Sequence, residues 1–214
     1  MSSHFFLDSY KHAIQTSLNL EYKFFRFKEY DSIETTPMSI VMRHDIDHNL
    51  ELALTMAKIE ASLGISSTFF VRTRAVKYNL LSMPSLNIVE QINNMGHEIG
   101  LHYEHFGKEA NLNKDILLHV KILEETLGKR VVSISPHEPC RNKSFVFSVS
   151  ELVGTGILHQ AYEDKFFKDM KYISDSSAHW REGPMINFIE KKVKRLYILT
   201  HPFWWYNTSP SENY

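Results

Sequence analysis

The sequence predicts a parallel α/β protein in which about seven short strands alternate with amphipathic helices. Short apolar runs rich in β-branched and aromatic residues recur along the chain, as buried strands do. Several of the segments between them space apolar residues as one face of a helix and end at glycine, which suits a helix C-cap. Titratable residues follow the carboxyl ends of the apolar runs. Strand and helix in repeated alternation indicate a parallel sheet.

The expected strands are short and bounded by turn residues. They cover residues 39–45, 67–73, 97–103, 131–135, 157–162, 171–176 and 196–201. The expected helices lie between them, at residues 51–64, 85–96, 113–128 and 183–195. In the last of these, the cations fall in the final turn, where the helix dipole favours them.

Two architectures fit this alternation, an open doubly wound sheet and a closed (β/α) barrel. The first expected strand is followed by RHDIDHN, residues 43–49, and not by a glycine-rich phosphate loop, which weakens a nucleotide-binding interpretation. In a barrel, catalytic groups gather at the carboxyl ends of the strands. Titratable residues stand at several of these ends, which favours the barrel: Asp45, Asp47, His102, His137, Asp175 and His201.

The composition is that of a globular protein. The chain has 214 residues, of which 43% are hydrophobic and 23% charged, so we expect one domain spanning residues 1–214. Lys and Arg total 24 and Asp and Glu total 25, a net charge of −1. No global positive field is therefore expected to hold nucleic acid or an anionic membrane.

Cysteine usage and the apolar pattern bear on the compartment. The single cysteine, Cys140, allows no intramolecular disulfide, so the fold does not require an oxidising environment. We see no signal-peptide pattern at the start, and no apolar run approaches the roughly 20 residues that span a bilayer. A cytoplasmic location is the resulting expectation, and the oligomeric state stays open.

Asp45 and Asp47 stand two positions apart at the end of the first expected strand. Alternate residues of an extended chain point to one face, so the two carboxylates would repel each other unless a cation neutralised one of them. The alternative is a solvated loop in which Asp47 or Asn49 caps the helix that begins near Leu50. Both interpretations stay open at this point.

Histidines gather near the ends of the next strands. His97, His102 and His105 lie within nine positions, and His102 is the better ligand candidate because it follows the apolar residues 98–101. His97 begins its strand and is expected to be a hydrogen-bonded core residue. His137 lies between two prolines in a stiff loop, which suits a metal ligand, a substrate-binding group or an ordinary turn.

The last third of the chain carries a further histidine and the tryptophans. Asp175 precedes Trp180 and Arg181, and an exposed tryptophan beside charged groups often stacks on sugar rings, whereas a buried one is core. His201 ends the last expected strand and is followed by an aromatic run that includes Trp204, which could line a pocket. We predict Trp180, Arg181 and Trp204 as substrate contacts.

Taken together, the motifs HDID, GHEIGLHYEH and LTH resemble the polysaccharide deacetylase family, also called NodB-like or carbohydrate esterase family 4. The resemblance extends roughly from Ile40 to Trp205, and HDID, SDSSAHWR and LTHPFWW resemble an atypical branch associated with surface-polysaccharide biosynthesis. It implies a deformed (β/α) barrel with about seven parallel strands. It also implies a divalent metal held by one Asp and two His, and hydrolysis of an acetamido group on a sugar.

Roles carried over by position follow from this resemblance. Asp45 resembles the catalytic base, Asp47 the metal-binding aspartate, His102 the first metal histidine and His201 the catalytic acid, while Asp175 and Trp180 resemble the segment that orients the final histidine. Ile46 separates two aspartates that are usually adjacent in the family. The family's second metal histidine corresponds to Phe106, and the usual Arg-Pro-Pro-Tyr type of motif is replaced by SPHEP.

The third metal ligand is therefore either His105 or His137. We predict His137, because the fourth strand of a barrel must end beside the site. The expected function is a metal-dependent hydrolase that removes an acetyl group from an N-acetylated sugar of a bacterial surface polysaccharide or its precursor. The expected ion is zinc, with Co, Ni or Fe also compatible. The alternatives are a non-catalytic carbohydrate-binding protein on the same fold and a metal-dependent amidase of a small non-sugar substrate.

Overall fold

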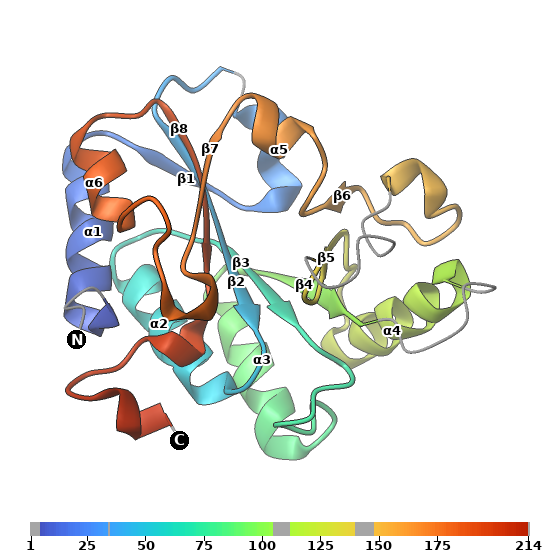
Figure 1. Cartoon of the computed structure of the whole chain (residues 1–214). Coiled ribbons are helices and arrows are strands. Elements are labelled where there is room, and N and C mark those ends of the chain that lie inside the picture. Colours follow the sequence, from blue (N-terminus) through green and yellow to red (C-terminus); the bar gives the residue numbers. More distant parts are fainter. Residues whose placement is uncertain (1–4, 34, 105–111, 140–147, 214) are drawn as a thin grey trace.

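The computed structural model describes residues 5–33, 35–104, 112–139 and 148–213. Its framework is one sheet in which every pairing is parallel, with helices against its outer face (Figure 1). The strands are β1 (Lys23–Phe25), β2 (Ser39–Ile46), β3 (Thr68–Val71), β4 (Glu98–Tyr103), β5 (Ser133–Pro136), β6 (His159–Gln160), β7 (Lys171–Ser174) and β8 (Arg195–Thr200). The helices are α1 (Leu7–Asn19), α2 (Leu50–Ser62), α3 (Met83–Asn94), α4 (Leu112–Leu127), α5 (Lys165–Lys168) and α6 (Met185–Glu190).

The strand order is β6-β5-β4-β3-β2-β8-β7, with β1 added beside the start of β2. The sheet curls into an open half-barrel whose path ends at β6 and β7 (Figure 1). This confirms the predicted deformed (β/α) barrel with its seven strands. Because all strands run in the same direction, their carboxyl ends meet at one edge.

Burial on both faces explains why the strands are so apolar. Inside the curl, Phe27, Val41, Phe70 and Tyr197 belong to one aromatic-rich cluster. Outside it, one cluster joins α2, α3 and α4 to β3, β4 and β5, and another joins α1 and α6 to β2 and β8. Polar side chains at the carboxyl edge of the sheet are therefore carried by strands that are packed in apolar clusters on both faces.

Helix ends follow local chemistry. Asn49 is the N-cap of α2, and its side chain accepts a hydrogen bond of 3.1 Å from the backbone N–H of Leu52. The sequence left open whether Asp47 or Asn49 caps this helix, and the cap is Asn49. Gly64, Gly96 and Gly128 follow α2, α3 and α4 with φ of 74°, 97° and 60°, a left-handed conformation that glycine adopts without strain.

Some predicted elements were wrong in extent. The helix expected at residues 183–195 covers only Met185–Glu190, because Lys192 turns the chain with a φ of 54° and returns it to the sheet. The sequence analysis also missed α1, β1 and α5. Among the described residues, no helix has both the length and the apolar character needed to cross a bilayer.

Candidate metal centre and catalytic groups

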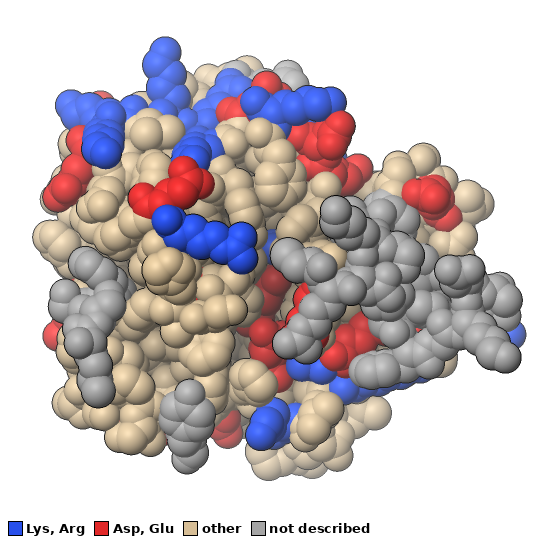
Figure 2. Space-filling view, viewed as in Figure 1, with Lys and Arg blue, Asp and Glu red and all other residues tan. Residues whose placement is uncertain are grey.

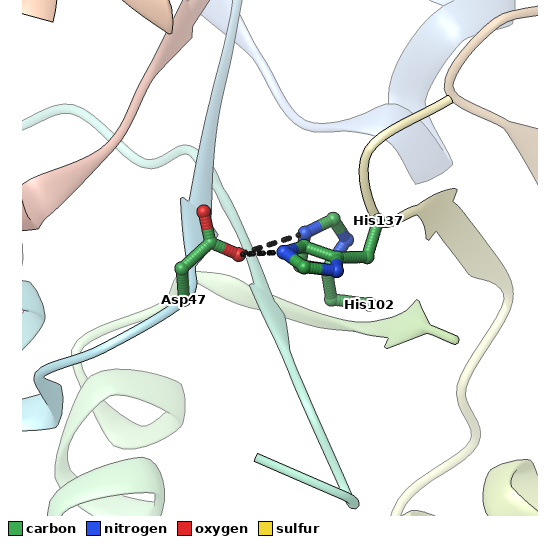
Figure 3. A group of neighbouring side chains, drawn as sticks. All are labelled: Asp47, His102 and His137. Carbon is green, nitrogen blue, oxygen red and sulfur yellow. Dashed lines mark ion pairs between the residues drawn. The ribbon is translucent and has the colours of Figure 1, made fainter. Parts of the chain in front are cut away.

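Asp47, His102 and His137 lie together at the carboxyl edge of the sheet (Figure 3). Asp47 follows β2, His102 lies in β4, and His137 follows β5. Asp47 Oδ1 is 3.2 Å from Nε2 of His102 and 3.3 Å from Nε2 of His137. One ligand atom from each residue lies within 4.8 Å of the others. Residues separated by 55 and by 35 positions in the chain thus converge on one point.

The His102 ring is fixed by the neighbouring strand. Its Nδ1 lies 2.9 Å from the carbonyl oxygen of Ser135, the residue that pairs with His102 in the β4–β5 ladder. A carbonyl only accepts, so Nδ1 carries the proton and Nε2 presents its lone pair toward Asp47. This orientation suits a metal ligand.

His137 is held by a carboxylate. Its Nδ1 lies 2.7 Å from Oε1 of Glu104 in an ion pair, and Glu104 forms a second ion pair with Arg72. Metal-binding histidines usually donate their second ring N–H to a carboxylate or a carbonyl, and here the Nδ1 of both rings faces such a group. The sequence motifs did not point to Glu104 or Arg72, although Glu104 stands two residues after His102.

The donor set fits a divalent cation. Oδ1 of Asp47 is buried and has no hydrogen-bond partner among the described residues. Burial by itself would raise the pKa of Asp47, but the facing rings of His102 and His137, when protonated, outweigh burial through their hydrogen bonds and charge and lower it, so the carboxylate is ionised. To bind a cation, the two rings would release the protons on the nitrogens that face Asp47. One carboxylate oxygen with two imidazole nitrogens suits zinc, and also Co, Ni or Fe.

Asp45 stands beside this group with one free oxygen. Its Oδ2 accepts a hydrogen bond of 3.3 Å from Oγ of Ser135 and lies 3.6 Å from Nη2 of Arg43 and 3.9 Å from Nε2 of His102. Oδ1 is buried without a hydrogen-bond partner among the described residues. Asp45 is therefore anchored through one oxygen and can accept a proton on the other.

His201 approaches from the other side, supported by Asp175. Its Nδ1 lies 2.6 Å from Oδ1 of Asp175, and its Nε2 lies 4.0 Å from Oδ2 of Asp47. Burial would lower the pKa of His201, but the charge of Asp175 and the hydrogen bond to it prevail and raise the pKa to about 9. His201 is consequently protonated at neutral pH.

The space-filling view shows a hollow in this face of the molecule. In Figure 2, acidic side chains are visible in a hollow near the middle of the face, while Lys and Arg gather at the end that carries α5 and α6. The net charge of −1 thus conceals a division between an acidic recess and a basic end. An acidic recess is suited to attract a cation.

The three residues predicted as substrate contacts differ in their exposure to solvent. Trp180 was expected at the rim, but it is only 7% exposed and packs between Phe5 and Trp205, with ring centroids 6.0 and 6.3 Å away. Because the ring is buried, the prediction that Trp180 stacks on a sugar is wrong. Trp180 contacts Trp205, which follows His201 in the chain. Trp204 is half-buried against Phe203, and Arg181 is exposed.

Four other residues that the sequence analysis discussed are His97, His105, His137 and Cys140. His97 is buried, and its two ring nitrogens face the backbone of Ser67 and of Ala57, as expected of a core histidine. His105 and Cys140 lie outside the described residues. Among the described residues, His137, the predicted third ligand, lies beside Asp47 and His102.

Comparison with solved structures identifies the fold. A carbohydrate esterase family 4 pseudoenzyme from Bacillus anthracis, in a mutant with restored enzymatic activity, matches with a TM-score of 0.50 and 16% identity over 78% of this chain. The chain has the fold of carbohydrate esterase family 4. This supports the resemblance that the sequence motifs indicated. No protein-family model and no curated protein sequence matches the chain.

Other structures with the family 4 fold give similar alignments. The chitin deacetylase of Colletotrichum lindemuthianum matches with a TM-score of 0.47 and 16% identity, covering 84% of this chain and 80% of the enzyme. A peptidoglycan N-acetylglucosamine deacetylase matches with a TM-score of 0.49 and 17% identity, covering 78% of this chain and 72% of that one. The chain spans only 57% of the Bacillus anthracis pseudoenzyme.

Proposed function

We propose that this chain is a metal-dependent deacetylase that hydrolyses the acetamido group of an N-acetylated sugar. The observation that carries the proposal is the convergence of Asp47, His102 and His137 on one point, with Asp45 and His201 beside it. Asp47, His102 and His137 would hold the cation. The family 4 fold, and the deacetylases of chitin and peptidoglycan that share it, support the reaction type.

The reaction exchanges one C–N bond for one C–O bond. Water adds its oxygen to the acetyl carbon, the C–N bond breaks, and acetate and a sugar amine leave. A bound divalent cation would supply polarisation of the carbonyl oxygen and a lower pKa for water. The protein must then remove one proton from water and deliver one to the nitrogen.

Asp45 is the group that accepts the proton from water. Its Oδ1 is unoccupied by any hydrogen bond among the described residues, while Oδ2 is held by Ser135 and lies near the Arg43 guanidinium. Anchoring one oxygen fixes the direction of the other, so little reorganisation is needed during the reaction.

His201 is the group that donates a proton to the leaving nitrogen. Asp175 binds Nδ1, so the proton available for transfer is the one on Nε2, which faces Asp47. The pKa of about 9 keeps His201 protonated at neutral pH. The base lies in β2 and the acid directly follows β8, and these two strands pair with each other.

The substrate class is the finer part of the proposal. The motifs that resemble a surface-polysaccharide branch of the family support an N-acetylated sugar of a bacterial surface polysaccharide or its precursor. Because Trp180 is buried, Trp204 and Arg181 are the remaining predicted side chains for substrate contact. Zinc is the ion that we propose.

Metal content and acetate release test the proposal together. Asp47→Ala and His102→Ala should lose bound zinc, whereas Asp45→Asn should keep zinc and lose at least about 100-fold in turnover, the effect of removing a general base. Elemental analysis of purified protein measures the first, and acetate release from N-acetylglucosamine oligomers measures the second. Asp8→Ala and His12→Ala are matched controls on the exposed face of α1.

The results separate the alternatives. Full zinc occupancy in both the Asp47 and the His102 variants would overturn the metal site. Zinc bound by the wild type without acetate release from any acetylated glycan would favour a non-catalytic carbohydrate-binding protein. Hydrolysis confined to small non-sugar amides would favour an amidase.

A further inference from the structure

We propose that Arg72 and Glu104 form a positioning pair that presents His137 to the cation. The inference rests on the proposed metal site and assigns a role to two residues outside the ligand set. Neither residue contacts substrate in this proposal. Both act through His137 and Asp47, by fixing which ring nitrogen faces the cation and where the two ligands stand.

His137 depends on side-chain support more than His102 does. His102 lies inside β4 and is 3% exposed, whereas His137 comes after the last residue of β5 and its side chain is 18% exposed. The backbone N–H of His137 donates to the carbonyl of Tyr103 over 2.9 Å, which places the residue but leaves its ring free to rotate. The ring is held through Nδ1, by Glu104 Oε1 at 2.7 Å.

Glu104 is placed to do this by its position in the chain. It follows β4 two residues after His102, so the two side chains leave the strand end on the same side. Its carboxylate lies 2.7 Å from Nδ1 of His137 and attracts a proton to that nitrogen, so Nε2, 3.3 Å from Oδ1 of Asp47, is the nitrogen that can coordinate the cation. The arrangement repeats for His137 what the Ser135 carbonyl does for His102.

Arg72 connects this pair to the first ligand. It lies directly after β3, between the strands that carry Asp47 and Glu104. Nη2 binds Glu104, and Nη1 donates to the backbone carbonyl of Asp47 over 3.3 Å. The Arg72 guanidinium thus links the backbone of Asp47 to the Glu104 carboxylate beside His137.

Charge explains why the pair needs both members. Arg72 is 5% exposed and the Glu104 side chain 11%, so an unpaired charge at either place would be strongly unfavourable. Without Arg72, the Glu104 carboxylate would repel Asp47 and would itself be drawn to the cation. Arg72 therefore keeps Glu104 as a partner of His137 and leaves Asp47 as the anionic ligand.

Zinc affinity tests the proposal without reference to activity. A competition titration with a chromophoric chelator would compare wild type with Glu104→Leu, Glu104→Gln and Arg72→Met. Glu104→Leu should weaken zinc binding about 10- to 100-fold, the usual effect of removing such a partner. Glu104→Gln should bind more tightly than Glu104→Leu, because the amide oxygen still accepts the Nδ1 proton. The matched controls are Asp115→Asn and Arg74→Met, which break an exposed Arg–Asp pair and should bind zinc as wild type does.

Two further readouts distinguish positioning from general damage. Thermal unfolding of the metal-free variants shows whether they fold. The visible absorption of the Co²⁺-loaded proteins should change in Glu104→Leu and return toward the wild-type spectrum in Glu104→Gln. Arg72→Met combined with Glu104→Leu should weaken zinc binding no more than Glu104→Leu alone, because the two residues act as one unit.

The outcomes bear separately on the two proposals. A folded Glu104→Leu variant that matches wild type in zinc affinity and cobalt spectrum while Asp47→Ala loses zinc would overturn the positioning role alone. Where Glu104→Leu does not fold, a folded Arg72→Met variant that matches wild type in both readouts would overturn it. Wild-type protein that binds neither zinc nor cobalt would overturn the proposed metal site.

Discussion

Asp175 and His201 form a partly buried hydrogen bond of 2.6 Å between the carboxylate and the imidazole Nδ1. Asp175 is completely buried, and its two oxygens also accept the backbone N–H of His201 and the indole N–H of Trp205, each at 3.0 Å. Three donors from the segment after β8 thus converge on one carboxylate from the end of β7. The pair is the reason that a buried histidine carries a proton at neutral pH.

Asp175→Asn should lower the pKa of His201 from about 9 toward the ordinary value of 6.5, because the amide carries no charge to favour the imidazolium. As a general acid, His201 is active when protonated, so the alkaline limb of kcat/KM should move to lower pH. A bound cation lowers the pKa of His201 in wild type and variant alike, and the difference between them remains. The control is Asp164→Asn, at an exposed carboxylate, which should leave the pH dependence of kcat/KM unchanged. An unchanged alkaline limb in Asp175→Asn would contradict the assignment of His201 as the general acid.

The same pair makes stability depend on pH. The pKa of His201 is higher in the folded protein than the ordinary 6.5, so the folded state binds its proton more tightly. This contribution is fully present below pH 6.5 and is lost as the pH rises through about 9. Its upper limit is about 3 kcal/mol, since each pKa unit corresponds to about 1.4 kcal/mol.

Urea unfolding of metal-free protein at several pH values between 6 and 10 measures this slope. The free energy of unfolding should fall with rising pH in wild type and much less in Asp175→Asn. Equal slopes in the two proteins would show that the Asp175–His201 pair does not hold the proton.

Much of the fold was predictable because strand and helix differ in the spacing of apolar residues. Each predicted strand corresponds to an observed one, from β2 to β8. The buried residues of α1 recur at helical spacing, so its apolar face was readable in the sequence although no helix was predicted there; they are Leu7, Tyr10, Ala13, Ile14 and Ser17. β1 has three residues, too few for a periodic pattern to stand out.

The candidate site was predictable where the chain places a ligand at a strand end. Asp47, His102 and His137 are such residues, and parallel strands bring their ends to one edge. Burial of Trp180 was not predictable, because its partner Phe5 lies 175 positions earlier in the chain. Arg72 and Glu104 likewise gain their significance only from a contact between neighbouring strand ends.

A second network of buried hydrogen bonds lies between α1, α2 and the strand β2 that carries Asp45. Glu60 of α2 is inaccessible to solvent and binds Tyr10, His44 and Ser67, the last two at 2.8 and 2.6 Å. Glu60→Leu should destabilise the protein by about 3–5 kcal/mol, because it leaves several buried polar groups unpaired. Urea unfolding measures the loss, and Glu51→Gln on the exposed first turn of the same helix should change stability by less than about 0.5 kcal/mol. A loss in Glu60→Leu as small as that of the control would show that the network adds nothing to stability.

Gly100 tests how closely the inside of the half-barrel is packed beneath the metal centre. A Cβ at this position would lie 2.5 Å from Cδ1 of Phe70 and 2.8 Å from Oγ of Ser133, closer than such atoms approach in proteins. Phe70 cannot easily retreat, since it packs edge-on against Phe27 with ring centroids 5.3 Å apart. Gly100→Ala should therefore cost about 1–3 kcal/mol in the free energy of unfolding.

The same substitution should also weaken zinc binding, because β4 carries His102 two residues after Gly100 and any shift of the strand moves the ligand. Phe70→Leu removes the ring that blocks the new methyl group, so Gly100→Ala should cost less stability in that background than in wild type. Urea unfolding of the four proteins and zinc titration of each provide the measurements. If Gly100→Ala lowers the free energy of unfolding equally in the wild-type and Phe70→Leu backgrounds, the steric clash is not with Phe70. If zinc affinity is unchanged in a destabilised Gly100→Ala variant, the shift of β4 does not extend to His102.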